Sequence, residues 1–189
     1  MSTSEALNLR EYTSADRAAC LAIFESNRPK YFSEHERTEF AEWLDKPDRA
    51  SYSVIEVDGD IVACGGIFHC PKKNHVGLAW GMVHSDLHGQ GIGRRLTEFR
   101  VEQMGQQFAE LEQRLATSQH TFRFYEKMGF TLTDVTADGF GQGIDRTTWC
   151  GPPLRFEPSW LCLRLGHGYL ADQNCFAPPQ RLNAPWIRR

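Results

Sequence analysis

At mid-chain the sequence reads His88-Gly89-Gln90-Gly91-Ile92-Gly93-Arg94-Arg95, a glycine-rich loop between two patterned segments. A β-rich run over 75–84 precedes the loop, and a run with Leu96, Phe99, Met104 and Phe108 at roughly three- and four-residue spacing follows it. The first pattern is typical of a strand and the second of an amphipathic helix. The sequence therefore predicts a strand that enters a helix through a glycine loop.

This arrangement predicts a site for a phosphate group. The first N–H groups of a helix have no partner within the helix, and together with the positive end of the helix dipole they attract anions. Glycines at 89, 91 and 93 let a pyrophosphate approach the main chain without a side chain in the way. The same glycines alone would also fit a simple strand-to-helix turn.

Two other phosphate-binding motifs fit this loop poorly. A P-loop requires Gly-Lys-Ser/Thr, whereas Arg94 follows Gly93 here. A Rossmann fingerprint lies near the first strand of a parallel unit and is followed by an acid about 20 residues on. This loop instead follows an antiparallel hairpin region at mid-chain, so both alternatives are minor.

The remaining pattern predicts a single α/β domain over residues 1–149. Capping-box signals at Thr13 and Ser33 start two helices, and Asp58-Gly59 joins two β-rich runs in the manner of a hairpin. The expected elements are strands at 7–10, 52–57, 61–68, 75–84, 114–116, 130–133 and 144–149, and helices ending near Phe24, before Pro47, after Phe108 and at Met128. We expect a central mixed, mostly antiparallel sheet of six to seven strands flanked by helices.

The strand over 75–84 has one large and one small set of alternating positions. Val76, Leu78, Trp80 and Met82 are large, whereas Gly77, Ala79 and Gly81 are small. Alternate residues of a strand point to opposite faces, so one face is expected to pack while the other leaves room for something to approach the main chain. Glycine at such positions indicates a bulge, a bend or a bound ligand.

Residues 150–189 read as an irregular, proline-rich C-terminal extension. Six of the nine prolines fall there, with two tryptophans and little periodicity. We expect this segment to be an appendage to the domain, partly draped on it or without fixed structure.

Composition argues against several classes of protein. The net charge of −3 argues against a dominant nucleic-acid-binding surface, and no apolar stretch is long enough to span a bilayer. The N-terminus lacks the pattern of a secretory signal, so we expect a cytoplasmic protein with reduced thiols. The six cysteines show no zinc-ligand spacing, so we expect no metal; Cys64 and Cys70 read as small buried apolar residues.

Two segments resemble motifs of the GNAT acetyltransferase superfamily. Residues 83–96 are similar to its acetyl-CoA loop, Gln/Arg-x-x-Gly-x-Gly/Ala, with His88 at the first position. Residues 118–130 are similar to its Phe-Tyr-Glu-Lys-x-Gly-Phe segment. The motifs occur in the family's order, and the resemblance covers about three-quarters of the chain. It implies acetyl-CoA as co-substrate and direct acetyl transfer to a primary amine.

The resemblance also implies roles for individual residues. Tyr125 matches the tyrosine that protonates the departing thiolate, although its spacing equally fits an aromatic core face. Ser118 matches a position that contacts the cofactor, and a helix cap is its ordinary alternative. The main-chain N–H near Val83 is the candidate to polarise the thioester carbonyl. Expected cofactor-binding residues are Val83, His88, Gly89, Gln90, Gly91, Ile92, Gly93, Ser118 and, through guanidinium–phosphate pairs, Arg94 and Arg95.

Several points stay open at this level. His75, His84 and Glu56 are candidate bases, but each fits an ordinary structural role equally well. The acceptor amine is not readable, and residues such as Phe32, Phe40, Trp43 and Phe140 suggest a partly aromatic pocket or simply core. A non-catalytic acyl-CoA sensor is the alternative to an enzyme, and a homodimer is left open.

Overall fold

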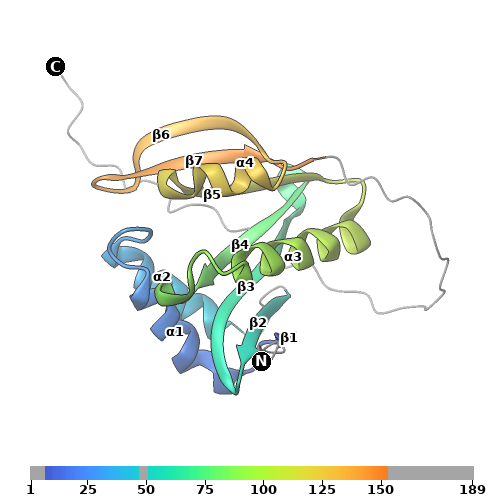
Figure 1. The fold of residues 1–189 in the computed structure, drawn as a ribbon. Coiled ribbons are helices and arrows are strands. Elements are labelled where there is room, and N and C mark those ends of the chain that lie inside the picture. Colours follow the sequence, from blue (N-terminus) through green and yellow to red (C-terminus); the bar gives the residue numbers. More distant parts are fainter. Residues whose placement is uncertain (1–6, 47–50, 153–189) are drawn as a thin grey trace.

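The computed structural model describes residues 7–46 and 51–152, which form a seven-stranded sheet with helices on both faces (Figure 1). The sheet order is β1-β2-β3-β4-β5-β7-β6. Its strands are β1 (Asn8–Glu11), β2 (Tyr52–Val57), β3 (Asp60–Cys70), β4 (His75–Val83), β5 (Glu112–Ser118), β6 (Thr131–Gly141) and β7 (Ile144–Cys150). The helices are α1 (Arg17–Ser26), α2 (Glu34–Leu44), α3 (Ile92–Phe108) and α4 (Phe122–Lys127).

The predicted element order is confirmed, because local signals in the sequence set the main boundaries. Both capping boxes form, at Thr13 and at Ser33. The β2–β3 hairpin turns at Asp58 and Gly59, whose φ angles of 53° and 91° are those of a tight turn with two positive φ values. The strands after the glycine loop are longer than predicted, since β5 and β6 exceed the short runs that the sequence suggested.

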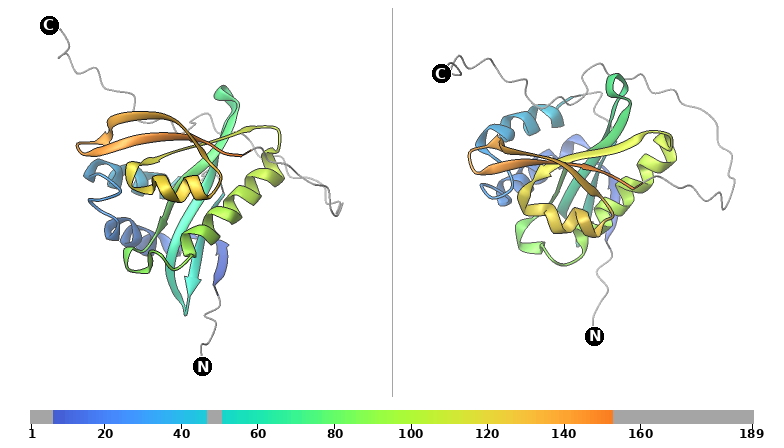
Figure 2. Two further views of the ribbon diagram at one scale, coloured as in Figure 1. Left: turned by 45° about the horizontal axis from the view of Figure 1, so that its top comes forward. Right: turned by 90° about the horizontal axis from the view of Figure 1, so that it is seen from above.

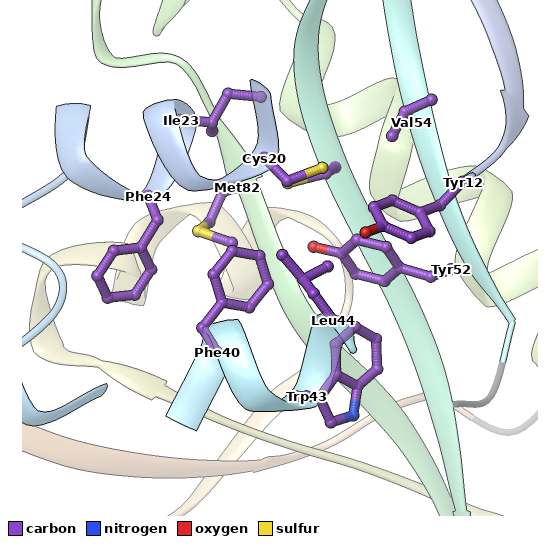
Figure 3. Close-up of a cluster of buried hydrophobic side chains, with 11 residues drawn as sticks. Tyr12, Cys20, Ile23, Phe24, Phe40, Trp43, Leu44, Tyr52, Val54 and Met82 are labelled. Atoms are coloured by element: carbon purple, nitrogen blue, oxygen red, sulfur yellow. The ribbon is translucent and has the colours of Figure 1, made fainter. Parts of the chain in front are cut away.

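The sheet separates two helical layers (Figures 1 and 2). On one face α1 and α2 bury an aromatic cluster against β2 to β4, in which Phe24 and Phe40 stack with ring centroids 5.5 Å apart (Figure 3). On the other face α3 packs on β3 and β4. The side chain of Phe124 on α4 lies next to Gly93 at the start of α3, so α3 and α4 lie on the same face of the sheet.

A bulge in β4 overturns the prediction of one continuous large face. Trp80 has a φ of 43°, and the pairing with β3 shifts between Cys64 and Gly66. Val76 and Leu78 therefore pack in the cluster with Met104 of α3, whereas Trp80 and Met82 pack with α1 and α2. A bulge puts two successive residues against one partner and so reverses the alternation beyond it.

The only parallel contact of the described sheet, between β4 and β5, is short. The two strands pair at His75, Val76 and Gly77 and then diverge, while β5 continues along β7 as far as Ser118 (Figures 1 and 2). The carboxyl ends of β4 and β5 thus lie apart and leave a gap in the sheet next to the glycine loop.

Candidate active site

The end of β4 turns polar main-chain groups toward this gap. The N–H of His84 donates to the carbonyl of Val62 at 2.8 Å, and Val83 is the neighbouring pair opposite Ala63. Alternate residues of an antiparallel ladder point away from the partner strand, so the N–H and C=O of Val83 face the gap. The carbonyl lies 2.8 Å from Nδ2 of Asn27 and 3.0 Å from Nε2 of His88.

The glycine loop presents a row of amides at the start of α3. Gly89 and Gly91 have φ angles of 81° and 86°, and a Cβ on either would meet no atom within 4 Å. Gly91 caps α3, with its carbonyl accepting from the N–H of Arg95 at 3.1 Å. In the described part of the chain, the N–H groups from Gly89 to Arg94 donate to no protein acceptor. Amides so placed at a helix N-terminus form an anion-binding surface.

The other loop residues have separate positions. Gln90 is exposed, whereas Ile92 is 6% exposed and packs in the core with Leu96. Gly93 lies between the side chains of Val83 and Phe124, 3.5 and 3.9 Å from where its Cβ would be. A Cβ at this position would make ordinary van der Waals contacts with both side chains, so Gly93 marks where α3 meets β4 and α4.

The structure does not bring the two loop arginines together. Arg94 pairs with Glu98 (Nε to Oε1, 2.7 Å) in a hollow of about 380 Å³ between α3 and α4 that Lys127 also lines. Arg95 lines a second hollow, beside β1 and β2. Only Arg94 lies on the α4 side, where the gap is.

His88 belongs to an aromatic group at the mouth of the gap. Its ring packs edge-on against Tyr31 with centroids 5.6 Å apart, and Tyr31 packs in the same way on His120 at 5.8 Å. Tyr31 follows α1 and His120 follows β5, so three separate segments meet here. Sequence spacing alone offered no signal for this contact.

Ser118 ends β5 beside the gap, and Tyr125 on α4 packs in the cluster that holds Leu78 of β4 and Leu115 of β5. Tyr125 is 8% exposed and packs against Phe124, Phe130 and Trp149, so the aromatic-core interpretation of its spacing is confirmed. Packing does not exclude a chemical role, because a buried tyrosine still presents its hydroxyl at one end. Ser118 is buried at the end of β5 and is the N-cap residue of the short 3-10 helix Gln119–Thr121, but its side chain makes no capping hydrogen bond.

The three candidate bases lie in different surroundings. His75 lies at the opposite end of β4 from Val83, roughly 26 Å away at about 3.3 Å per residue. Its pKa is lowered, chiefly by burial. Nδ1 of His84 accepts from the N–H of Asp86, and Glu56 pairs with Arg10 at 3.2 Å. None of the three is positioned by these contacts to act beside Tyr125.

Arg100 of α3 is a residue that the sequence pattern did not single out. It is 2% exposed, and its guanidinium lies against Gly65 and Gly81 of the two central strands. The signal was present, because Arg100 stands four residues after Leu96 and four before Met104, on the buried stripe of the helix.

The aromatic residues expected near an acceptor divide into two groups. Phe40 and Trp43 are 0% and 7% exposed and belong to the core. Phe32 is half-buried and packs on the half-buried Trp80, with centroids 6.2 Å apart. A Cβ on Gly141 would lie 3.2 Å from Cβ of Ser33, so the β6–β7 hairpin reaches the start of α2 beside them.

Within 7–46 and 51–152, no group of three or more His, Cys, Asp or Glu side chains is arranged to hold a metal ion. No helix in the same ranges is long and apolar enough to cross a membrane. Four cysteines of the described residues, Cys20, Cys64, Cys70 and Cys150, form no disulfide, and the first three are buried, as the sequence predicted for Cys64 and Cys70.

The sequence profile of the acetyltransferase (GNAT) family matches residues 18–130, from α1 to the start of β6. The chain belongs to the GNAT family. The match includes both motifs and every strand of the sheet from β2 to β5. The gap between β4 and β5 and the glycine loop are thus features of a GNAT domain.

A curated relative, the amino-acid acetyltransferase of Mannheimia succiniciproducens, is 30% identical over 91 residues. The match covers 47% of this chain and 20% of that protein, so this chain spans only a small part of the relative's length.

Solved GNAT structures share the fold. A protein of the family from Desulfovibrio desulfuricans is 20% identical, with a TM-score of 0.66, 79% of this chain and 100% of that chain covered. The ribosomal-protein-S18-alanine N-acetyltransferase of Escherichia coli is 16% identical, with a TM-score of 0.66 and coverages of 82% and 100%. An acetyltransferase-type protein from Salmonella typhimurium, solved with its cofactor acetyl-CoA, is 16% identical, with a TM-score of 0.63 and coverages of 84% and 99%.

Proposed function

We propose that this chain transfers an acetyl group from acetyl-CoA to a primary amine by direct attack, without a covalent acyl-enzyme. The observation that carries the proposal is the row of unpaired amides at the glycine loop beside the gap between β4 and β5. Membership of the GNAT family supports it, and a structural neighbour was solved with acetyl-CoA.

The binding part of the proposal follows from the main chain. The diphosphate of coenzyme A lies on the amides from Gly89 to Arg94, where charge-assisted hydrogen bonds and the helix dipole favour an anion. The pantetheine arm runs into the gap between β4 and β5 and passes Ser118. His88 stands in the position that is often Gln or Arg in the family, and its Nε2 hydrogen-bonds the carbonyl of Val83. The main-chain amides therefore bind the phosphates without the His88 side chain.

The chemical part assigns each change of charge to a group. The lone pair of the amine attacks the thioester carbonyl, and the oxygen gains negative charge that the N–H of Val83 stabilises. The carbonyl re-forms as the C–S bond breaks, and the electron pair goes to sulfur. Tyr125 gives its proton to that sulfur, and the proton lost by the amine restores the tyrosine through water. The products are the acetamide and coenzyme A.

The acceptor approaches from the α1–α2 side in this proposal. Half-buried Phe32 and Trp80, with the end of the β6–β7 hairpin beside Ser33, form the wall available there. The curated relative acts on an amino acid and the Escherichia coli neighbour on a protein alanine, so small amines, amino acids and peptide N-termini are the acceptors to test.

Calorimetric titration with acetyl-CoA, followed by an assay for released thiol over an amine panel, tests the proposal. Tyr125→Phe is expected to keep the affinity for acetyl-CoA and to lower kcat on the order of 10²-fold or more, since general acids contribute 10² to 10⁴. Tyr12→Phe removes the hydroxyl of a buried tyrosine that packs on Tyr52, in a different core cluster from Tyr125, and is the control expected to keep kcat unchanged. Absence of acetyl-CoA binding would reject the proposal, and binding without turnover of any amine would favour an acyl-CoA sensor.

A further inference from the structure

Arg100 is a buried cation that pairs with no carboxylate in the described part of the chain. Nε donates to the carbonyl of Leu96 at 3.3 Å and Nη2 to Oγ1 of Thr97 at 3.2 Å. Nη1 has no hydrogen-bond partner of normal geometry among the described residues, and no carboxylate in those ranges forms an ion pair with the guanidinium. Burial lowers the pKa of Arg100.

Two glycines create the space that the guanidinium occupies. A Cβ on Gly65 would lie 2.9 Å from Nη1, and a Cβ on Gly81 only 2.4 Å from it. Gly81 is itself an exposed position of β4, one residue beyond the Trp80 bulge, where β4 has left β5. The guanidinium therefore lies directly beneath the main chain that borders the gap.

Two phenol groups and one thiol lie near this cation. The phenol groups of Tyr125 on α4 and Tyr52 on β2, and the thiol of Cys64 on β3, oppose the effect of burial on the pKa of Arg100. Tyr52 already donates to the carbonyl of Trp80 at 3.0 Å, which fixes its hydroxyl at the bulge. Tyr125 is thus the neighbour of Arg100 that packs in a cluster with β4 and β5, the strands on either side of the gap.

Stability of the fold does not account for this arrangement. Burying an unpaired charge is unfavourable, and replacing buried charged groups by apolar side chains of similar volume is often neutral or stabilising. Buried donors without a partner call for an explanation, and one explanation is a catalytic role. A fixed positive charge is most useful where negative charge develops during a reaction.

We propose that Arg100 is a positioning residue for acetyl transfer, which orients the hydroxyl of Tyr125 and supplies a preorganised positive charge beside the C–S bond that breaks. This inference rests on the proposed function. When the electron pair of that bond moves to sulfur and Tyr125 gives up its proton, the negative charge left on the phenol oxygen faces the guanidinium. The charge is neutralised when the proton released by the amine returns to Tyr125.

The expected effect is a loss of kcat with little change in binding. Removing one preorganised electrostatic group from an active site costs on the order of 10²- to 10³-fold in kcat. Arg100 acts through Tyr125, so we expect Arg100→Met to lower kcat on the order of 10²-fold, with the Kd for acetyl-CoA and the KM for the amine within about threefold. Arg100→Lys keeps the charge, and its kcat is expected to be on the order of tenfold higher than that of Arg100→Met.

A thiol-specific readout separates this role from a structural one. The affinity of the full chain for coenzyme A is compared with its affinity for desulfo-coenzyme A as pH rises and the bound thiol ionises. The wild-type chain is expected to favour coenzyme A increasingly, and Arg100→Met to lose that preference. Arg114→Met, on an exposed arginine of β5 that pairs with Glu112, is the matched control and retains it.

A double-mutant cycle covers the case in which Arg100→Met fails to fold. Gly81→Ala displaces the guanidinium without removing its charge, so it is expected to lower kcat in the wild-type background. The same change should cost little in an Arg100→Lys background, where no group fills that space. Equal kcat in wild type and Arg100→Met, or additive effects in the cycle, would overturn the inference. Failure of the wild-type chain itself to bind acetyl-CoA would instead overturn the proposed function.

Discussion

Gly91→Ala separates the conformational role of the glycine loop from its binding role. Gly91 has a φ of 86° and a ψ of −10°, the left-handed region that costs an ordinary residue about 1–2 kcal/mol. A Cβ there meets no atom within 4 Å, so no steric clash adds to that cost. We expect a loss of about 1 kcal/mol in the free energy of unfolding and a fall in Tm of roughly 2–4 °C.

The effect on cofactor affinity is expected to be larger than this strain. If the loop relaxes to relieve the alanine, the amides of the first turn of α3 no longer point at one place. A hydrogen bond to a charged group contributes about 1.5–3 kcal/mol, and losing one raises the Kd for acetyl-CoA roughly ten- to hundredfold.

Gly59→Ala is the matched control for this variant. Gly59 has a φ of 91°, it also has no atom within 4 Å of its built Cβ, and it lies in the β2–β3 hairpin. Thermal unfolding is expected to show a similar loss of stability in both variants, whereas calorimetry is expected to show weaker acetyl-CoA binding in Gly91→Ala alone. Equal affinity in the two variants would refute the idea that the loop amides hold the cofactor.

Three further predictions concern the scaffold. Arg10 and the N–H of Thr13 lower the pKa of Asp16 to about 2, below its ordinary 3.8. The carboxylate therefore stabilises the fold by ~1–2 kcal/mol above about pH 4, and this contribution is lost as pH falls toward 2. In Asp16→Asn the free energy of unfolding is expected to lack this fall over the same pH range, and an unchanged fall would contradict the assignment. Tyr52→Phe leaves the carbonyl of Trp80 without its donor and is expected to cost about 1 kcal/mol in urea unfolding, whereas a neutral result would show that the bulge needs no such bond. Trp149→Ala removes a 1% exposed ring and is expected to cost about 3–5 kcal/mol in the same assay; a loss below 1 kcal/mol would contradict its place in the core.

Local chemistry made much of the fold predictable from the sequence. The Asp58-Gly59 turn requires positive φ angles that few residue pairs tolerate, and Thr13 and Ser33 cap helices through contacts three residues away. Such signals depend only on residues close together in the chain, so they can be recognised without knowledge of the tertiary structure. The two GNAT motifs then located the glycine loop and Tyr125 on the elements where the structure has them.

What the sequence did not predict depends on contacts between distant segments. The positive φ of Trp80 has no local signal, since a bulky residue is unfavourable there, and it reversed the faces of Met82 and of the end of β4. Arg100 was overlooked because an arginine on a helix is usually exposed, and only Gly65 and Gly81 from two strands make room for it. The predicted extension covers 150–189; Cys150 still belongs to β7, and residues 153–189 lie outside the described residues, so the appendage stays a prediction.

A crystal structure of the full chain with bound acetyl-CoA tests the central claim most directly. We expect diphosphate oxygens within hydrogen-bonding distance of the amides between Gly89 and Arg94, and the sulfur between the separated ends of β4 and β5, next to the hydroxyl of Tyr125. A cofactor bound elsewhere, or a diphosphate held by side chains with these amides facing solvent, would contradict the account.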